Sequence, residues 1–78
     1  MTASEILKKA REQAKMSQTE FAEYFQIPRR TLQDWEYNRR KMPYYLLRLM
    51  IYKLEVEKLA YGLSDELEDG ESLWESIL

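Results

Sequence analysis

Residues 16–43 read MSQTEFAEYFQIPRRTLQDWEYNRRKMP, and this stretch decides the fold of the 78-residue chain. Ser17 and Glu20 form a capping box, in which an N-cap hydroxyl and a carboxylate three residues later satisfy two free helix amides. The box predicts a short helix from Ser17 to about Phe25. Its inward side chains, by helical spacing, are Phe21, Ala22 and Phe25.

A break at residues 26–28 separates this helix from the next one. Pro28 suits the start of a helix, because the N–H that it lacks would have no helical partner there. A second helix is therefore expected over residues 29–37, and Asn38 can end it in the left-handed conformation. Two short helices joined by a three-residue break predict a helix-turn-helix. The inward side chains of the second helix are Leu32 and Trp35.

Helices are also expected on both sides of this motif. Thr2 and Glu5 form another capping box, which predicts a helix to about Lys15. Pro43 begins a long helix that is expected to continue through Tyr61. The chain has only two Gly and two Pro, and no strand-like alternation runs for more than a few residues. The predicted fold class is all-α: a small helical bundle with a helix-turn-helix, a long fourth helix and a short acidic C-terminal helical tail.

Residues 7–54 resemble the lambda-repressor-like, Cro-type helix-turn-helix domain. The resemblance implies that residues 29–37 form the recognition helix and that Arg11 and Glu36 form a structural ion pair. It also implies that the Gln18 side chain and the nearby helix N-terminal amides contact a DNA phosphate. The chain departs from the family pattern at the turn and the helix ends, where Gln26, Pro28 and Asn38 stand. The matching residues are Ser17-Gln18, Phe21-Ala22, Ile27, Thr31-Leu32, Trp35-Glu36 and Pro43.

Arg29 and Arg30 fall in the first turn of the expected recognition helix. Cations are unfavourable there, by roughly 0.3–1 kcal/mol, because the helix dipole is positive at that end. Phosphates and guanine edges would remove this penalty, since Arg pairs bidentately with guanine O6 and N7. The alternative is a solvated turn in which Arg30 pairs with Asp34. Asp34 itself either orients Arg30 or accepts a hydrogen bond from a cytosine amine, and orienting is preferred.

The candidate DNA-contacting residues extend from this turn to the basic loop that follows. Three adjacent cations directly after a recognition helix favour contact with phosphates, although such a run can also be simply solvated. The predicted DNA-binding residues are Gln18, Arg29, Arg30, Thr31, Gln33, Asp34, Tyr37, Arg39, Arg40 and Lys41.

The long fourth helix is apolar on more than one face. One stripe, Leu47, Met50 and Leu54, suits the domain core. A second stripe follows the heptad spacing of a coiled-coil seam, and a single domain cannot easily bury both. Either a second copy of the chain or the C-terminal tail covers it; a twofold homodimer is the preferred prediction. The expected dimer seam is Tyr45, Leu49, Tyr52, Val56, Leu59 and Leu63.

The charges divide the chain at residue 62. Residues 1–62, the expected DNA-binding domain with its long fourth helix, hold 12 basic and eight acidic side chains, a net charge of +4. Residues 63–78, the acidic amphipathic tail, hold six acidic side chains and no basic one. The tail is expected to bind a basic protein partner, with solubilisation or docking on its own domain as alternatives. Its anchors are Leu73, Trp74, Ile77 and Leu78.

Composition excludes several classes of function. The chain has no His and no Cys, so the usual nucleophile–base pairs and zinc ligand sets are absent, and neither an enzyme, a metal site nor a cofactor is expected. No apolar run is long enough to span a membrane, and a cytoplasmic location is predicted. The preferred function is a sequence-specific transcriptional regulator that binds double-stranded DNA. The alternative is an antitoxin that regulates its own operon and neutralises a basic toxin with its tail.

Overall fold

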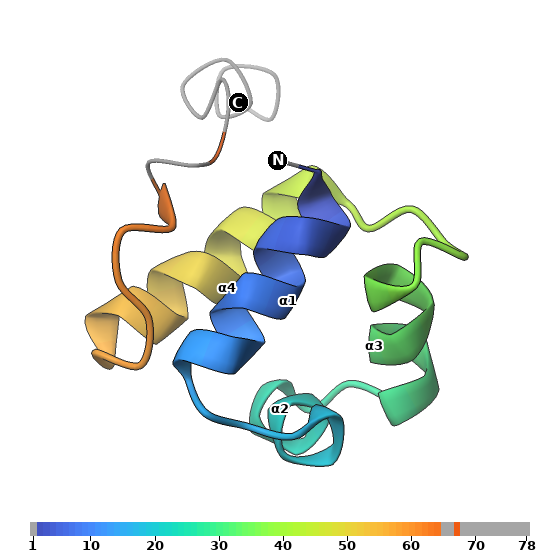
Figure 1. Ribbon diagram of the computed structural model, residues 1–78, viewed down its shortest axis with the longest axis horizontal. Coiled ribbons are helices and arrows are strands. Elements are labelled where there is room, and N and C mark those ends of the chain that lie inside the picture. Colours follow the sequence, from blue (N-terminus) through green and yellow to red (C-terminus); the bar gives the residue numbers. More distant parts are fainter. Residues whose placement is uncertain (1, 65–66, 68–78) are drawn as a thin grey trace.

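The computed structural model describes residues 2–64 and 67. These residues form four α-helices (Figure 1), and the all-α helix-turn-helix bundle is therefore confirmed. The predictions for residues 65–66 and 68–78, which include the expected final helix and the tail anchors, lie outside the described residues. The helices are α1 (Ala3–Gln13), α2 (Gln18–Phe25), α3 (Arg29–Glu36) and α4 (Tyr44–Val56).

The first two helices begin with the two predicted capping boxes. The Ser17 hydroxyl accepts from the Glu20 amide at 3.1 Å, and the Glu20 carboxylate accepts from the Ser17 amide at 2.8 Å. Thr2 and Glu5 make the same reciprocal pair at the start of α1. The hydrogen bond from the Ser17 backbone lowers the pKa of the Glu20 carboxyl, and the Thr2 backbone does the same for the pKa of Glu5.

Each of the four helices is followed, within two residues of its end, by a residue that has a left-handed backbone and is not glycine. At the end of α4, Lys58 has a φ of 61°, and the Leu59 amide donates back to the Leu54 carbonyl at 2.8 Å. This is the Schellman arrangement, which usually has Gly at the left-handed position. The four left-handed residues are Lys15, Gln26, Asn38 and Lys58.

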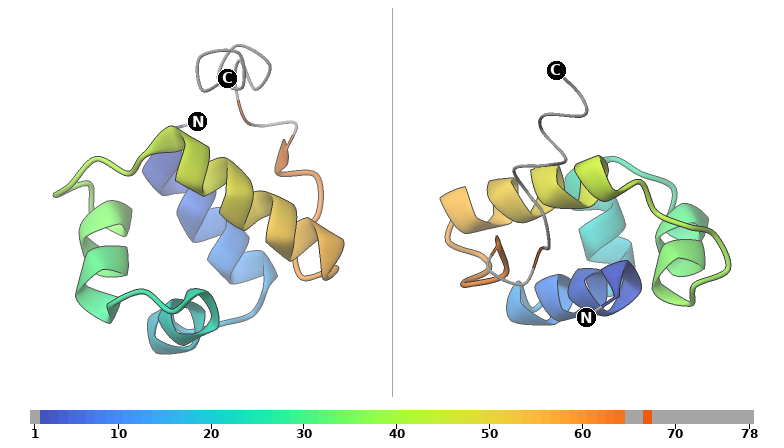
Figure 2. Two further views of the ribbon diagram at one scale, coloured as in Figure 1. Left: turned by 180° about the vertical axis from the view of Figure 1, so that it is seen from behind. Right: turned by 90° about the horizontal axis from the view of Figure 1, so that it is seen from above.

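The prediction that the fourth helix continues to Tyr61 is wrong, because α4 ends at Val56. After the turn at Lys58 the chain doubles back (orange in Figure 2). The Glu55 carboxylate holds the returning segment by accepting from the amides of Leu63 and Ser64, at 2.9 and 3.2 Å. The intrinsic propensity of residues 56–61 favours a longer helix, but such propensities are small. Burying the Leu63 side chain in the core stabilises the fold by more than the lost helical turn would.

The core lies between α1, α3 and α4, with α2 packed against α3. The predicted inward residues of the motif, Leu32 and Trp35, are buried. The core also includes Leu63 and Leu67, so the packed part of the chain extends past the expected boundary at residue 62. Within the described part of the chain, no helix is long and apolar enough to cross a membrane. The largest fully buried apolar side chains are Ile6, Leu7, Phe21, Leu32, Leu47, Ile51, Leu54 and Leu63.

Candidate nucleic-acid interface

Helix α3 has one face in the core and its first turn in solvent. Leu32, Trp35 and Glu36 are buried against the rest of the domain. Arg29 and Arg30 are exposed, and Thr31 is half-buried. One side of the helix therefore packs against the domain, and the two arginine side chains of its first turn are exposed to solvent.

The start of α3 differs from the starts of α1 and α2. Pro28 is the N-cap residue, and it makes no side-chain capping hydrogen bond. No acidic residue stands in the first turn, whereas Glu5 and Glu20 stand in the first turns of α1 and α2. Uncapped amides and the positive end of the helix dipole favour an anion, and Arg29 and Arg30 add two formal charges to them.

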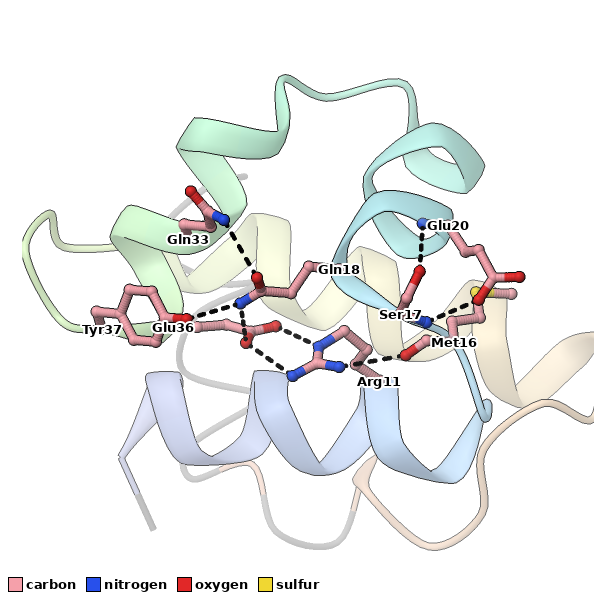
Figure 3. Close-up of polar contacts among 8 residues, drawn as sticks. All are labelled: Arg11, Met16, Ser17, Gln18, Glu20, Gln33, Glu36 and Tyr37. Atoms are coloured by element: carbon pink, nitrogen blue, oxygen red, sulfur yellow. Dashed lines mark hydrogen bonds and ion pairs between the residues drawn. The ribbon is translucent and has the colours of Figure 1, made fainter.

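A buried ion pair connects α1 to the end of α3 (Figure 3). The Glu36 carboxylate is 2% exposed and accepts two hydrogen bonds from Arg11, at 2.8 Å from Nε and 3.1 Å from Nη2. The remaining Arg11 nitrogen, Nη1, donates to the Met16 carbonyl at 3.2 Å. The hydrogen bond to Glu36 raises the pKa of Arg11. The pair that the resemblance implies is thus present, and it also fixes the turn before α2.

Gln18, the first residue of α2, extends this network to the surface of α3. Its Nε2 donates to Glu36 Oε1 at 3.1 Å and to the Tyr37 hydroxyl at 3.4 Å. Its Oε1 accepts from Gln33 Nε2 at 3.2 Å. Figure 3 shows the Gln18 side chain with its contacts to Gln33, Glu36 and Tyr37. The Gln18 amide is therefore engaged inside the protein, so the phosphate contact implied for it would have to come from the backbone at the start of α2.

Asp34 pairs with Arg39, and not with Arg30 as expected. The distance from Arg39 Nε to Asp34 Oδ1 is 3.2 Å, and the amides of Arg39 and Arg40 both donate to the Asp34 carbonyl. The left-handed turn at Asn38 bends the chain back over the last turn of α3, which brings Arg39 to Asp34. The Arg39 guanidinium also lies 5.1 Å from the centre of the Tyr37 ring. Arg39 is thus held on the helix that precedes it.

The rest of the basic loop is exposed. Arg40 and Lys41 lie between α3 and α4 with their side chains in solvent. The described residues contain no group of His, Cys, Asp and Glu side chains that could hold a metal ion.

The contacts of Gln18 with Gln33 and Tyr37 were not predicted from the sequence. No local spacing reveals them, because they depend on how α2 and α3 pack.

The expected dimer seam does not continue along one helix. Leu59 lies beyond the end of α4 and packs against the core, and Leu63 is fully buried. The heptad spacing fails there because the helix on which it depends ends at Val56. The other four seam residues form an exposed apolar strip on α4, which we call the α4 strip; its members are Tyr45 (51% exposed), Leu49 (46%), Tyr52 (69%) and Val56 (60%).

Comparison with known proteins agrees with this geometry. A family model described as helix-turn-helix matches residues 7–49, more than half of the chain. No curated protein matches the chain. No solved structure matches it either. The matched residues contain α2, α3, the ion pair and the basic loop. This chain therefore belongs to the lambda-repressor-like, Cro-type helix-turn-helix family of DNA-binding regulators.

Proposed function

We propose that the protein is a sequence-specific transcriptional regulator in the cytoplasm and that α3 reads the DNA major groove. The observation that carries this proposal is the start of α3, where Arg29 and Arg30 are exposed beside uncapped helix amides. Arg side chains in this position can reach guanine O6 and N7. The buried face of α3 holds the helix rigidly, so both side chains are presented from a fixed backbone.

The basic loop has the complementary role of contacting the DNA backbone. Arg40 and Lys41 are exposed and suit phosphates, which fix the position of a protein on DNA without reading the sequence. Arg39 is tied to Asp34 and Tyr37. Its charge is therefore partly compensated, and it supports the loop more than it strengthens binding.

Site selection from random DNA, followed by binding to the selected and to unrelated sequences, tests this division of roles. Arg29→Ala or Arg30→Ala should cost about 1–3 kcal/mol on the selected site and relax base preference, whereas Arg40→Ala should weaken all sequences about equally. Wild-type affinity should fall as salt rises, with each phosphate contact adding about −0.9 to the slope of log K against log salt. Salt-independent binding, or equal losses on both DNAs for both α3 arginines, would contradict the proposal.

We further propose that the regulator binds as a twofold homodimer through the α4 strip. Four large apolar side chains on one helix face form a continuous strip from Tyr45 to Val56, and such strips mark interaction surfaces. Dimeric helix-turn-helix proteins place two recognition helices on half-sites about one DNA turn apart. A second copy of the same strip would cover these side chains and pair the half-sites.

Sedimentation of a charge variant tests the dimer. Tyr52→Lys should raise the monomer fraction and weaken binding to a palindromic site more than to a half-site. Tyr61→Lys is the matched control, since Tyr61 is equally exposed (67%) but lies outside the α4 strip. A wild-type chain that sediments as a monomer at high concentration would contradict the dimer.

The antitoxin function remains the second candidate, and the charge pattern is the observation that favours it. Residues 63–78 hold six acidic side chains and no basic one. This negative charge is complementary to a basic protein partner. Leu63 and Leu67 pack in the core, so we narrow the proposed partner-binding segment to residues 69–78, which hold all four predicted anchors. Copurification of the chain with a small basic protein encoded next to it tests this candidate.

A further inference from the structure

We infer that the second copy of the chain lies antiparallel on the α4 strip, so that Tyr45 of one copy packs against Val56 of the other. The inference rests on the proposed homodimer and states how its two copies are arranged. A twofold axis along the facing helices makes them parallel, and a twofold axis across them makes them antiparallel. The side-chain sizes, the charges and the place of the strip in the fold favour the antiparallel arrangement.

The α4 strip alternates large and small side chains. Along the helix, Tyr45 is followed by Leu49, and Tyr52 is followed by Val56. An antiparallel copy centred on the strip sets Tyr45 against Val56 and Leu49 against Tyr52, so every level pairs a large side chain with a small one. Facing positions of this kind interdigitate and fill the space between two helices. A parallel copy would set tyrosine against tyrosine and leave the level of Val56 underfilled.

The charges beside the strip agree with this arrangement. Arg48 and Glu55 are half-buried, and their separation of about two helical turns puts both on one edge of the strip. An antiparallel twofold brings like edges together, so Arg48 of each copy lies beside Glu55 of the other, and the dimer gains two pairs of opposite charge. A parallel twofold would bring this edge to the opposite one. There Lys53 would face Arg48 as well as Glu55, so repulsion would offset attraction.

The position of α3 at one end of α4 is the third argument. Figures 1 and 2 show α3 beyond the N-terminal end of α4, away from its C-terminal end. An antiparallel copy therefore puts the two α3 helices at opposite ends of the dimer. Because α4 has 13 residues, its two N-terminal ends are then about 20 Å apart, and each α3 lies further out. This agrees with half-sites roughly 34–36 Å apart, whereas a parallel copy would bring the two N-terminal ends to about 10 Å.

Engineered cysteines distinguish the two arrangements, because the chain has no cysteine of its own. In an antiparallel dimer, position 45 faces position 56, whereas the two copies of position 56 lie about 16 Å apart along the helices. A disulfide requires Cα atoms within about 7 Å of each other. Tyr45→Cys and Val56→Cys, mixed and oxidised, should therefore give about tenfold more crosslinked dimer than either variant gives alone. A tag on one variant identifies the mixed dimer by its mass.

A second pair of variants tests the arrangement without oxidation. Tyr45→Lys and Val56→Glu should each weaken the dimer alone, and sedimentation of their mixture should show the dimer restored, because opposite charges then face each other. The matched control for crosslinking is Tyr61→Cys, since Tyr61 is exposed but lies outside the strip. It should crosslink only slowly, alone or with either strip variant. Thermal unfolding verifies that every variant is folded.

Three results overturn the arrangement alone, in a wild type that sediments as a dimer. In the first, Val56→Cys or Tyr45→Cys crosslinks with itself as readily as the two crosslink together. In the second, the mixture crosslinks no faster than the Tyr61→Cys control. In the third, Tyr45→Lys is rescued by Tyr45→Glu and not by Val56→Glu, which means that the copies pair in parallel. If the wild-type chain stays monomeric at high concentration, the proposed homodimer itself fails, and the inference falls with it.

Discussion

Arg11 on α1 and Glu36 at the end of α3 share two hydrogen bonds, although 25 residues separate them in the sequence. The carboxylate is buried, and the guanidinium side chain is 21% exposed. Arg11 Nη1 also holds the carbonyl of Met16, in the turn before α2. One arginine thus ties together α1, the entry to α2 and the end of α3. The orientation of α3 therefore depends on an ion pair at the end of the helix opposite Arg29 and Arg30.

The first prediction concerns the loss of one partner of this pair. Arg11→Met should lower the free energy of unfolding by on the order of 3 kcal/mol, because the buried Glu36 carboxylate loses its counter-charge. Urea denaturation measures the effect. The double variant Arg11→Met/Glu36→Met should recover most of the loss, since a buried ion pair contributes little beyond an apolar replacement.

The exposed pair Lys53–Glu57 provides the control for this prediction. Its nitrogen and oxygen lie 3.5 Å apart, and both side chains are about half exposed. Lys53→Met should change the free energy of unfolding by less than about 0.5 kcal/mol. If Arg11→Met also lowers the free energy of unfolding by less than about 0.5 kcal/mol, then the stability of the fold does not depend on the counter-charge of Glu36.

The second prediction concerns the left-handed helix ends. Gln26 and Lys58 have φ values of 55° and 61°, which cost a residue with a Cβ about 1–2 kcal/mol. Glycine avoids this strain, and its greater freedom in the unfolded chain offsets part of the gain. Gln26→Gly and Lys58→Gly should each raise the free energy of unfolding by about 0.5–1 kcal/mol.

Thermal unfolding compares the stability of both variants with that of a third variant, in which glycine is placed inside a helix. Glu23→Gly, at an exposed position of α2, should lower the free energy of unfolding by about 1 kcal/mol because Gly is a poor helix former. A loss of stability in Gln26→Gly similar to that of Glu23→Gly would mean that the left-handed backbone carries no strain that glycine relieves.

Local signals in the sequence were sufficient for the helix starts and for the motif. A capping box lies within four residues, so Thr2–Glu5 and Ser17–Glu20 can be recognised without tertiary structure. The inward positions Leu32 and Trp35 follow from helical periodicity, which is also local. Asn38 was expected to end α3 because Asn tolerates the left-handed region, and its φ of 60° agrees.

Features that depend on packing between distant segments could not be predicted. Periodicity extended α4 to Tyr61, because nothing local shows that Leu63 will be buried in the core. Asp34 is expected to orient Arg30, whereas the turn at Asn38 brings Arg39 to it. The contact between Gln18 and Gln33 joins two helices and has no signature in either one.

The third prediction concerns acid stability. The Thr2 and Ser17 backbones lower the pKa values of Glu5 and Glu20 below their ordinary value of 4.5. A carboxyl with a lowered pKa in the folded state stabilises the protein above about pH 4.5, and this contribution is lost as the pH falls through the folded value. Glu5→Gln/Glu20→Gln keeps a side chain suited to the capping box but cannot titrate.

Melting temperatures measured from pH 7 to pH 3 test this prediction. The wild type should lose stability below pH 4.5 more steeply than the double variant, and the two curves should run parallel above pH 5.5. Curves that remain parallel throughout would show that the capping carboxylates contribute nothing to the acid dependence.

The last prediction separates the core from the partner-binding segment. Removing residues 63–78 deletes Leu63, which is fully buried, and Leu67, which is 9% exposed. Deleting one buried Leu side chain costs about 2–5 kcal/mol, so this truncation should melt at a much lower temperature than the full chain. It also removes the two amides that the Glu55 carboxylate accepts from.

Removing residues 69–78 leaves every described core residue in place. This shorter truncation should keep the melting temperature and bind DNA within a few-fold of the full chain. If the antitoxin candidate holds, it should lose its basic partner in copurification, and Trp74→Ala in the full chain should cause most of the same loss, since aromatic anchors dominate interface energies. A chain ending at residue 68 that retains its partner at full affinity would exclude the segment as the binding element. A chain ending there that unfolds would instead place residues 69–78 in the stabilising part of the domain.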